Sequence, residues 1–154
     1  MKILTLNTWQ EMGPWQQRWE VILDGIRRFR PDLVAFQELF NHSWAQEIQK
    51  TTGFPTLLFS PEKNGGLALY THYAVPSWDV VKLSQSPLEE YFRYVLWAEL
   101  HVNGSRLFVF NTHFSWLPED GATRNKQVDE VLYLIQKEAP SEEGVVMGDL
   151  NATR

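Results

Sequence analysis

The chain has 154 residues, of which 44% are hydrophobic and 21% are charged, and its formal net charge is -5. This length is enough for one domain with a sizeable core. The acidic balance disfavours non-specific binding to nucleic acid, which needs clustered lysine and arginine. Cysteine is absent, which excludes disulfides, thiolate zinc sites and cysteine nucleophiles. No apolar run has the length of a signal-peptide core or of a membrane span, so we expect a cytoplasmic protein.

The chain begins with a short apolar run followed by an amphipathic segment. Residues 3–6 are typical of a buried strand. A helix is predicted from Gly13-Pro14 to Arg30, because proline is tolerated in the first helical turn and the residue before Pro31 is pushed out of the helical region. Its apolar side chains fall on one face at helical spacing: Trp15, Trp19, Ile22, Leu23 and Ile26.

Further strands and a short helix are predicted before a tight turn. Residues 33–37 form a second apolar run, and Asn41 or Ser43 can cap a short helix that ends at Gly53. Strands at 56–60 and 67–71 flank residues 61–65, whose last two residues suit a hairpin turn.

The second half predicts a long hairpin, a helix and a final strand. Residues 91–102 and 106–113 are joined by Asn103-Gly104, the strongest hairpin signal in the chain. Apolar residues at helical spacing over 123–138, with Pro140 beyond them, predict a helix, and residues 144–148 return to a strand. No repeat or flexible linker divides the chain. The sequence therefore predicts a single α/β domain with mixed strand directions.

Four of the apolar runs end abruptly on polar side chains. Buried strands of this kind can bring the groups at their ends together at one sheet edge. Carboxylate, amide and imidazole groups have the ligand character of a hard-cation site that handles phosphate. The polar residues are Asn7, Gln37, Glu38, Asn111, His113, Asp149 and Asn151.

These residues lie in motifs that resemble those of the endonuclease/exonuclease/phosphatase superfamily. The order and rough spacing of the motifs match over essentially all 154 residues. The resemblance implies a four-layer α/β sandwich that hydrolyses phosphodiesters or phosphomonoesters with Mg²⁺ or Mn²⁺. The motifs are Leu6-Asn7-Thr8-Trp9, Gln37-Glu38, Gly65-Gly66-Leu67-Ala68-Leu69-Tyr70, Asn111-Thr112-His113, Arg124 with Gln127, and Gly148-Asp149-Leu150-Asn151.

The resemblance also implies a role for individual residues. Glu38 would be the principal metal ligand, and Asn7 would help to hold the metal or its water. Asp149 would activate or orient the attacking water. Asn151 would bind the scissile phosphate, and His113 would steady the charge on it.

A divalent ion is favoured on electrostatic grounds as well. Two carboxylates about 4–5 Å apart repel by about 3–4 kcal/mol at an effective dielectric of about 20, and a cation removes that conflict. Magnesium usually takes only one or two protein carboxylates together with water and substrate phosphate. One glutamate with amide oxygens fits this arrangement, so we expect Mg²⁺ or Mn²⁺ as the cofactor.

Other polar residues allow two interpretations each. Arg93 either faces solvent from a strand-like run or reaches the substrate phosphate. Asn111 either binds substrate or bonds local backbone as a turn residue. Arg124 and Gln127 share a face of a predicted helix, where they either hold loops around the site or lie exposed.

Two tryptophans follow candidate site residues on predicted loops. Trp9 and Trp116 could each meet a base, a lipid headgroup or an aryl leaving group. With the phosphoesterase chemistry that the resemblance implies, we expect a phosphate-ester substrate that is a lipid headgroup, a nucleotide or a nucleic-acid end.

The resemblance stops at the Asp149/Asn151 motif, whereas family members continue through a second half. That half adds strands, another metal-site aspartate and a Ser-Asp-His-like motif. We expect residues 1–154 to be the N-terminal portion of such a domain and to need the missing half for activity. An apolar sheet face should be exposed unless a C-terminal segment or a homodimer covers it. The alternatives are a non-catalytic binding or assembly module that keeps the scaffold, and a sugar hydrolase that pairs Glu38 with another carboxylate.

Overall fold

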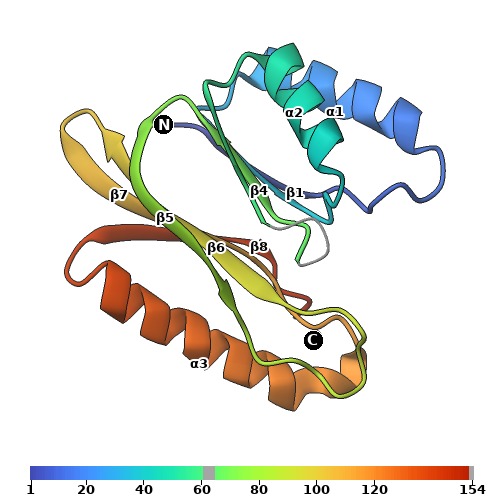
Figure 1. Cartoon of the computed structure of the whole chain (residues 1–154), viewed down its shortest axis with the longest axis vertical. Coiled ribbons are helices and arrows are strands. Elements are labelled where there is room, and N and C mark those ends of the chain that lie inside the picture. Colours follow the sequence, from blue (N-terminus) through green and yellow to red (C-terminus); the bar gives the residue numbers. More distant parts are fainter. Residues whose placement is uncertain (61–64, 153–154) are drawn as a thin grey trace.

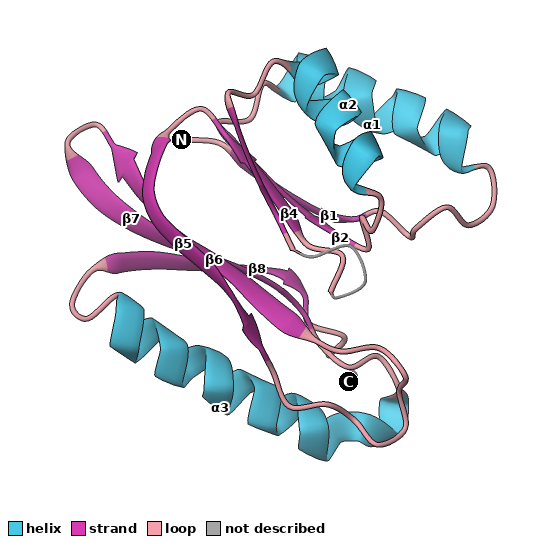
Figure 2. Cartoon of the chain, viewed as in Figure 1, coloured by secondary structure: helices cyan, strands magenta, loops and turns pink. Residues whose placement is uncertain are grey.

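The computed structural model describes residues 1–60 and 65–152 and shows four layers (Figure 1). The layers are a pair of helices, two β-sheets face to face, and a third helix (Figure 2). The predicted α/β class with mixed strand directions is therefore confirmed. The turn predicted at residues 61–65 lies, except for Gly65, outside the described residues.

The first sheet has the strand order β1-β2-β4-β3. β1 and β2 are parallel, while β4 runs antiparallel to both β2 and β3. The strands are β1 (Ile3–Asn7), β2 (Leu33–Gln37), β3 (Thr56–Phe59) and β4 (Ala68–Thr71).

Helices α1 (Trp15–Phe29) and α2 (His42–Thr52) cover the outer face of this sheet (Figure 1). The predicted apolar face of α1 packs against the sheet and α2 in one core. Of the two caps predicted for α2, Asn41 is the one used, because its side chain accepts a hydrogen bond from the Trp44 N–H.

The second sheet has the strand order β5-β6-β7-β8, with α3 (Gly121–Glu138) on its outer face (Figure 2). The predicted hairpin through Asn103-Gly104 joins antiparallel β6 and β7, and β8 runs parallel to β7. No helix within the described residues is long and apolar enough to cross a membrane. The strands are β5 (Ala74–Lys82), β6 (Tyr94–Val102), β7 (Ser105–His113) and β8 (Glu143–Asp149).

Two features of this sheet differ from the sequence-based expectation. β5 is absent from the predicted elements, because it is a mostly exposed edge strand with Pro76 near its start and an irregular register after Ala74. β6 begins at Tyr94, so residues 91–93 of the predicted strand lie in the loop before it.

The expected exposed sheet face is also not found. The inner faces of the two sheets cover each other, and side chains such as Leu69 and Val109 share one core between them. Edge strands β1 and β8 lie against each other, and each pairs with one strand only among the described residues. Leu6 on β1 and Val146 on β8 are 36% and 44% exposed there. The uncovered surface is therefore a pair of strand edges.

Gly148 sets the close approach of β8 to β7 next to the polar strand ends. Its φ is 139°, and a Cβ here would lie 1.9 Å from the Thr112 carbonyl oxygen. We expect Gly148→Ala to lower the free energy of unfolding by at least about 2 kcal/mol, because left-handed strain alone costs about 1–3 kcal/mol. Urea unfolding followed by circular dichroism measures this change. Gly144→Ala on the same strand is the control, since its nearest neighbours are 3.7 Å away; equal losses for both variants would contradict the argument.

Candidate active site

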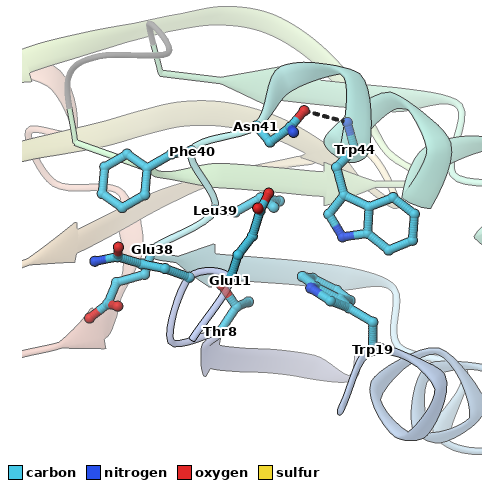
Figure 3. A pocket seen from close by; sticks show the side chains of 9 residues that line it. Thr8, Glu11, Trp19, Glu38, Leu39, Phe40, Asn41 and Trp44 are labelled. Atoms are coloured by element: carbon cyan, nitrogen blue, oxygen red, sulfur yellow. Dashed lines mark hydrogen bonds between the residues drawn. The ribbon is translucent and has the colours of Figure 1, made fainter. Parts of the chain in front are cut away.

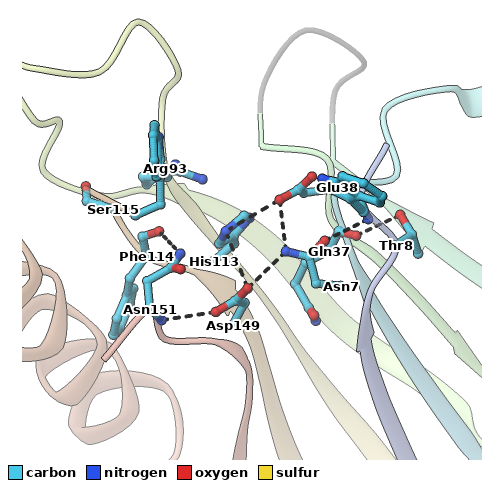
Figure 4. A network of polar contacts seen from close by, with 12 residues as sticks. Asn7, Thr8, Gln37, Glu38, Arg93, His113, Phe114, Ser115, Asp149 and Asn151 are labelled. Carbon is cyan, nitrogen blue, oxygen red and sulfur yellow. Dashed lines mark hydrogen bonds and ion pairs between the residues drawn. The ribbon is translucent and has the colours of Figure 1, made fainter. Parts of the chain in front are cut away.

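The polar ends of β1, β2, β7 and β8 meet at one end of the sandwich (Figure 4). The expectation of a single sheet edge is wrong, because β1 and β2 belong to one sheet and β7 and β8 to the other. Parallel pairing places Asn7 beside Gln37 and His113 beside Asp149. The two sheets then bring these pairs together.

Asn7 bridges the two carboxylates of the site. Its Nδ2 donates to Glu38 Oε1 and to Asp149 Oδ2, each at 2.9 Å. Its Oδ1 accepts a hydrogen bond from the Trp9 backbone N–H at 2.8 Å. Asn7 therefore presents both of its amide hydrogens to the carboxylates, while its oxygen accepts one backbone hydrogen bond and keeps a second acceptor position. These contacts position the two carboxylates, and the role of Asn7 in holding the metal or its water stays a prediction.

The backbone of Glu38 is held on both sides. The preceding Gln37 carbonyl accepts from the Thr8 N–H, and the following Leu39 N–H donates to the Gly66 carbonyl, both at 2.9 Å. Glu38 itself has a left-handed φ of 60°. One carboxylate oxygen bonds to Asn7, while no hydrogen bond within the described residues uses Oε2. This second oxygen is the one available to a cation.

Asp149 and Asn151 form a local hydrogen-bonded unit. The Asn151 backbone N–H donates to Asp149 Oδ1 at 3.0 Å, and Asn7 bonds to the other oxygen. Asn151 Nδ2 donates to the Phe114 carbonyl at 2.9 Å. Because an amide nitrogen carries two hydrogens, one donor of Asn151 remains for a ligand.

His113 lies between the two carboxylates (Figure 4). Its Nε2 is 3.9 Å from Glu38 Oε1 and 3.9 Å from Asp149 Oδ2. Burial lowers the pKa of His113 to about 4, with a further contribution from the Arg93 charge, and the Asp149 charge opposes both. The imidazole is therefore neutral at neutral pH and acts as a hydrogen-bond donor without carrying a charge.

Arg93 lies at the edge of the same site and is held by a residue that the sequence analysis missed. Its Nε and one Nη donate to Glu89 Oε2 at 2.9 and 2.8 Å. The other Glu89 oxygen accepts from the Trp116 backbone N–H at 2.6 Å. Arg93 is only 8% exposed, so the solvent-facing interpretation is wrong. The sequence did not indicate a role for Glu89, because a single glutamate in a loop forms no recognisable motif.

Asn111 does not reach the site. It is fully buried, and its Nδ2 donates to the Phe36 and Ala68 carbonyls at 3.0 and 3.1 Å. Its Oδ1 accepts from Gln37 Nε2 at 2.7 Å. We therefore correct the predicted substrate-binding role: Asn111 ties β7 of one sheet to β2 and β4 of the other.

Arg124 and Gln127 hold the loop that follows β7. Arg124 donates to the carbonyls of Ser115, Leu117 and Pro118, and Gln127 Oε1 accepts from the Ser115 N–H. Both side chains are buried. The exposed-face interpretation is therefore wrong, and the loop-holding one describes the contacts.

The site residues line a cavity of about 560 Å³, a volume typical of ligand sites. Its polar wall contains Glu38, Arg93, His113, Asp149 and Asn151. We call this space the catalytic cavity. Aromatic side chains form much of the remaining wall: Trp9, Phe40, Tyr91, Phe92 and Trp116.

A second cavity of about 450 Å³ adjoins it on the side of α1 and α2 (Figure 3). Trp19 and Trp44 form one wall, and the Glu11 side chain lies opposite them (Figure 3). Glu38 lines both cavities. A ligand in the catalytic cavity therefore has room to extend on this side of the site.

Left-handed backbone is concentrated around the catalytic cavity. Seven non-glycine residues of the described chain have positive φ, and four of them line this cavity: Trp9, Gln10, Glu38 and Asn151. Each such residue costs about 1–3 kcal/mol and persists only where its surroundings enforce it. More than half of the strained non-glycine residues of the described chain therefore lie at this cavity.

The oxygen ligands at the cavity wall suit a divalent cation that takes few protein ligands. Residues 1–60 and 65–152 contain no group of three or more His, Cys, Asp or Glu side chains arranged to hold a metal ion. Magnesium, however, keeps several waters and usually takes one or two carboxylates. The unpaired oxygen of Glu38 at the cavity wall fits such a sparse site.

Comparisons with known proteins identify the family and support the fold. The model of the Endonuclease/Exonuclease/phosphatase family matches residues 4–154. No curated protein matches the chain. Similar solved structures include D. rerio TDP2 humanized by 14 mutations (TM-score 0.83, 18% identity) and the human Nocturnin catalytic domain with bound sulfate (0.83, 19%). A mannosyl-6-phosphatase of Bacteroides thetaiotaomicron is also similar (0.79, 16%).

These structural matches cover 99% of this chain but 63%, 65% and 65% of the three neighbours, respectively. The chain thus spans less than two thirds of their length. At such identities the likeness shows the fold alone.

Proposed function

Because the chain belongs to the endonuclease/exonuclease/phosphatase family, we propose that it hydrolyses a phosphate ester with an activated water and a divalent cation. The observation that carries this proposal is the convergence of Glu38, His113, Asp149 and Asn151 from two sheets on one cavity. Two carboxylates, an imidazole and an amide therefore line one cavity of ligand size.

Asp149 is the residue that takes a proton from the attacking water. Hydrogen bonds from Asn7 and Asn151 fix both carboxylate oxygens, so the group is oriented before substrate binds. Each oxygen keeps acceptor capacity, because a carboxylate has about four acceptor positions. A positioned base of this kind contributes about 10²–10⁴-fold to the rate.

Three donors bind the phosphate group. Asn151 has one free amide hydrogen, neutral His113 has one ring N–H, and Arg93 has guanidinium hydrogens beyond those used by Glu89. Hydrogen bonds from such fixed donors stabilise the charge that develops on a phosphoryl group. Because Glu89 anchors Arg93, its charge is presented with little loss of side-chain entropy.

Glu38 would hold Mg²⁺ or Mn²⁺ through its unpaired oxygen. When bound, the ion acts as a Lewis acid on a phosphoryl oxygen. The backbone contacts on both sides of Glu38 keep its carboxylate at the cavity wall.

We expect Glu38→Gln to weaken Mn²⁺ binding by at least about tenfold, because even residues that only support a metal ligand contribute 10–100-fold to affinity. Chelation with EDTA should likewise stop hydrolysis of bis(p-nitrophenyl) phosphate. Isothermal titration calorimetry measures the affinity, and release of nitrophenolate measures the rate. Glu47→Gln, an exposed carboxylate on α2, is the control. An unchanged Mn²⁺ affinity in Glu38→Gln would contradict the proposal.

The non-catalytic module is the alternative from another class. This alternative would be favoured if forms of the protein with and without the C-terminal segment bound Mn²⁺ and phosphate but hydrolysed no ester. The sugar hydrolase is not favoured, because glycosidase carboxylates flank a sugar, whereas here one amide nitrogen bridges Glu38 and Asp149.

We extend the proposal to the uncovered strand edges. Leu6 and Val146 are exposed on β1 and β8, and the solved neighbours are longer than this chain. Activity is proposed to need a C-terminal segment that pairs with these edges, or a second copy of the chain that does so. Light scattering coupled to size-exclusion chromatography, read together with the hydrolysis rate, tests this. Full hydrolysis by monomeric residues 1–154 would contradict it.

A further inference from the structure

Exposed aromatic side chains surround the mouth of the catalytic cavity. Trp9, Tyr91 and Trp116 line the cavity and are 56%, 59% and 55% exposed. Large aromatic groups gathered beside a polar pocket mark a binding surface. The two tryptophans stand on loops from opposite halves of the sandwich, one after β1 and the other after β7.

The loop that carries Trp9 is held rigidly although its side chain is exposed. Arg18 on α1 donates to the carbonyls of Thr8, Trp9, Gln10 and Met12 at 3.0 to 3.3 Å. The same guanidinium lies 5.2 Å from the centre of the Trp9 ring. Trp9 also keeps a left-handed φ of 55°, so the contacts fix a strained backbone that projects the indole at the cavity mouth.

The loop that carries Trp116 is held in the same manner. Arg124 on α3 donates to the carbonyls on either side, those of Ser115 and Leu117, at 3.1 and 2.6 Å. The Trp116 N–H donates to Glu89, which also holds Arg93. Each exposed tryptophan thus stands on a loop whose carbonyls are clamped by an arginine from the helix of its own half.

We propose that Trp9 and Trp116 are stacking platforms for a planar aromatic group carried by the phosphate ester. This inference rests on the proposed function, because the platforms adjoin the phosphate-binding side chains. Rigid aromatic surfaces bind with little loss of conformational entropy. A planar group joined to the phosphate reaches the platforms when the phosphate occupies the cavity. The substrate class is therefore an aryl or heteroaryl phosphoester.

The charge at the cavity mouth favours this ligand over a membrane surface. Anionic lipid surfaces attract exposed lysine and arginine clusters. Among the described residues that line the cavity, the cationic one is Arg93, which is nearly buried and paired with Glu89. Arg18, beside the Trp9 ring, donates to backbone carbonyls. Lys82 lies outside the lining, over the Phe92 ring at 3.4 Å from its centre. A concave mouth with fixed aromatic rings suits a small planar group.

Binding of two non-hydrolysable probes tests the platforms. Calorimetric titration with phenylphosphonate and methylphosphonate in the presence of Mg²⁺ separates the planar group from the phosphate. Phenylphosphonate should bind at least about fivefold more tightly, since stacking on one aromatic side chain is of that size or larger. Trp9→Ala and Trp116→Ala should each reduce this preference and leave methylphosphonate binding unchanged, and Trp→Tyr at either position should restore part of it.

Trp78→Ala is the matched control, because Trp78 on β5 is 45% exposed and does not line the cavity. Two results would contradict the proposed stacking on Trp9 and Trp116. One is equal affinity for the two probes, and the other is a preference for phenylphosphonate that persists in both alanine variants. The parent chain could instead show no phenyl preference and bind vesicles of phosphatidylcholine and phosphatidylserine, with this binding lost in the two alanine variants. That result would assign the mouth to a membrane and also overturn the proposal. If neither probe binds, the phosphate site fails, and with it the proposed function.

Discussion

Replacing Asp149 by asparagine is expected to lower kcat for phosphodiester hydrolysis by about 10²–10⁴-fold, the usual contribution of a positioned general base. Asparagine has nearly the size of aspartate, and its single oxygen can accept the hydrogen bond of Asn7 or of the Asn151 N–H, although not both. It cannot take a proton from water. The loss should therefore appear in kcat far more than in KM, because the phosphate contacts come from Asn151, His113 and Arg93.

Initial rates with bis(p-nitrophenyl) phosphate, in the active form of the protein, measure this effect. Asp129→Asn on the exposed side of α3 is the control and should hydrolyse at the parent rate. Thermal unfolding should show that Asp149→Asn is still folded at the assay temperature, which separates chemistry from folding. A kcat equal to that of the control would remove Asp149 from the proposed mechanism.

Replacing Asn111 by alanine is expected to lower the free energy of unfolding by about 3–5 kcal/mol. The variant removes the hydrogen bonds that Asn111 donates to the Phe36 and Ala68 carbonyls. Gln37 Nε2 loses one acceptor and keeps Thr5 Oγ1. Each unsatisfied buried group costs about 1–3 kcal/mol. Asn111 is fully buried between the sheets. Bulk water therefore does not replace the lost hydrogen bonds.

Urea unfolding measures this loss, with Asn125→Ala on the exposed surface of α3 as the control. A surface variant of that kind changes stability by less than about 0.5 kcal/mol. Unchanged stability of Asn111→Ala, combined with a raised KM, would instead support the substrate-binding role that the buried geometry argues against.

Local signals in the sequence predicted most of the elements. The apolar run of β2, the Asn103-Gly104 turn and the apolar face of α1 each act over a few residues, so the chain reveals them directly. β5 carries no such signal. It is an exposed edge strand with a proline, and its pairing with β6 depends on a partner that lies elsewhere in the sequence.

The position of a site residue could be predicted where a motif coincides with a strand end. It could not be predicted where the position depends on how the two sheets pack. Glu38 and Asp149 follow apolar runs, so their shared position could be expected. The burial of Asn111 depends on how β7 lies over β2 and β4, which no local pattern shows. The Glu89 contact with Arg93 joins residues of one loop whose path is set by tertiary packing.

The most direct measurement is anomalous scattering from crystals of the protein grown with Mn²⁺ and phosphate. We expect a manganese peak at the Glu38 carboxylate, inside the cavity lined by His113, Asp149 and Asn151, and loss of that peak in Glu38→Gln. A phosphate-filled cavity with no manganese at Glu38, or a manganese site on another surface, would contradict it.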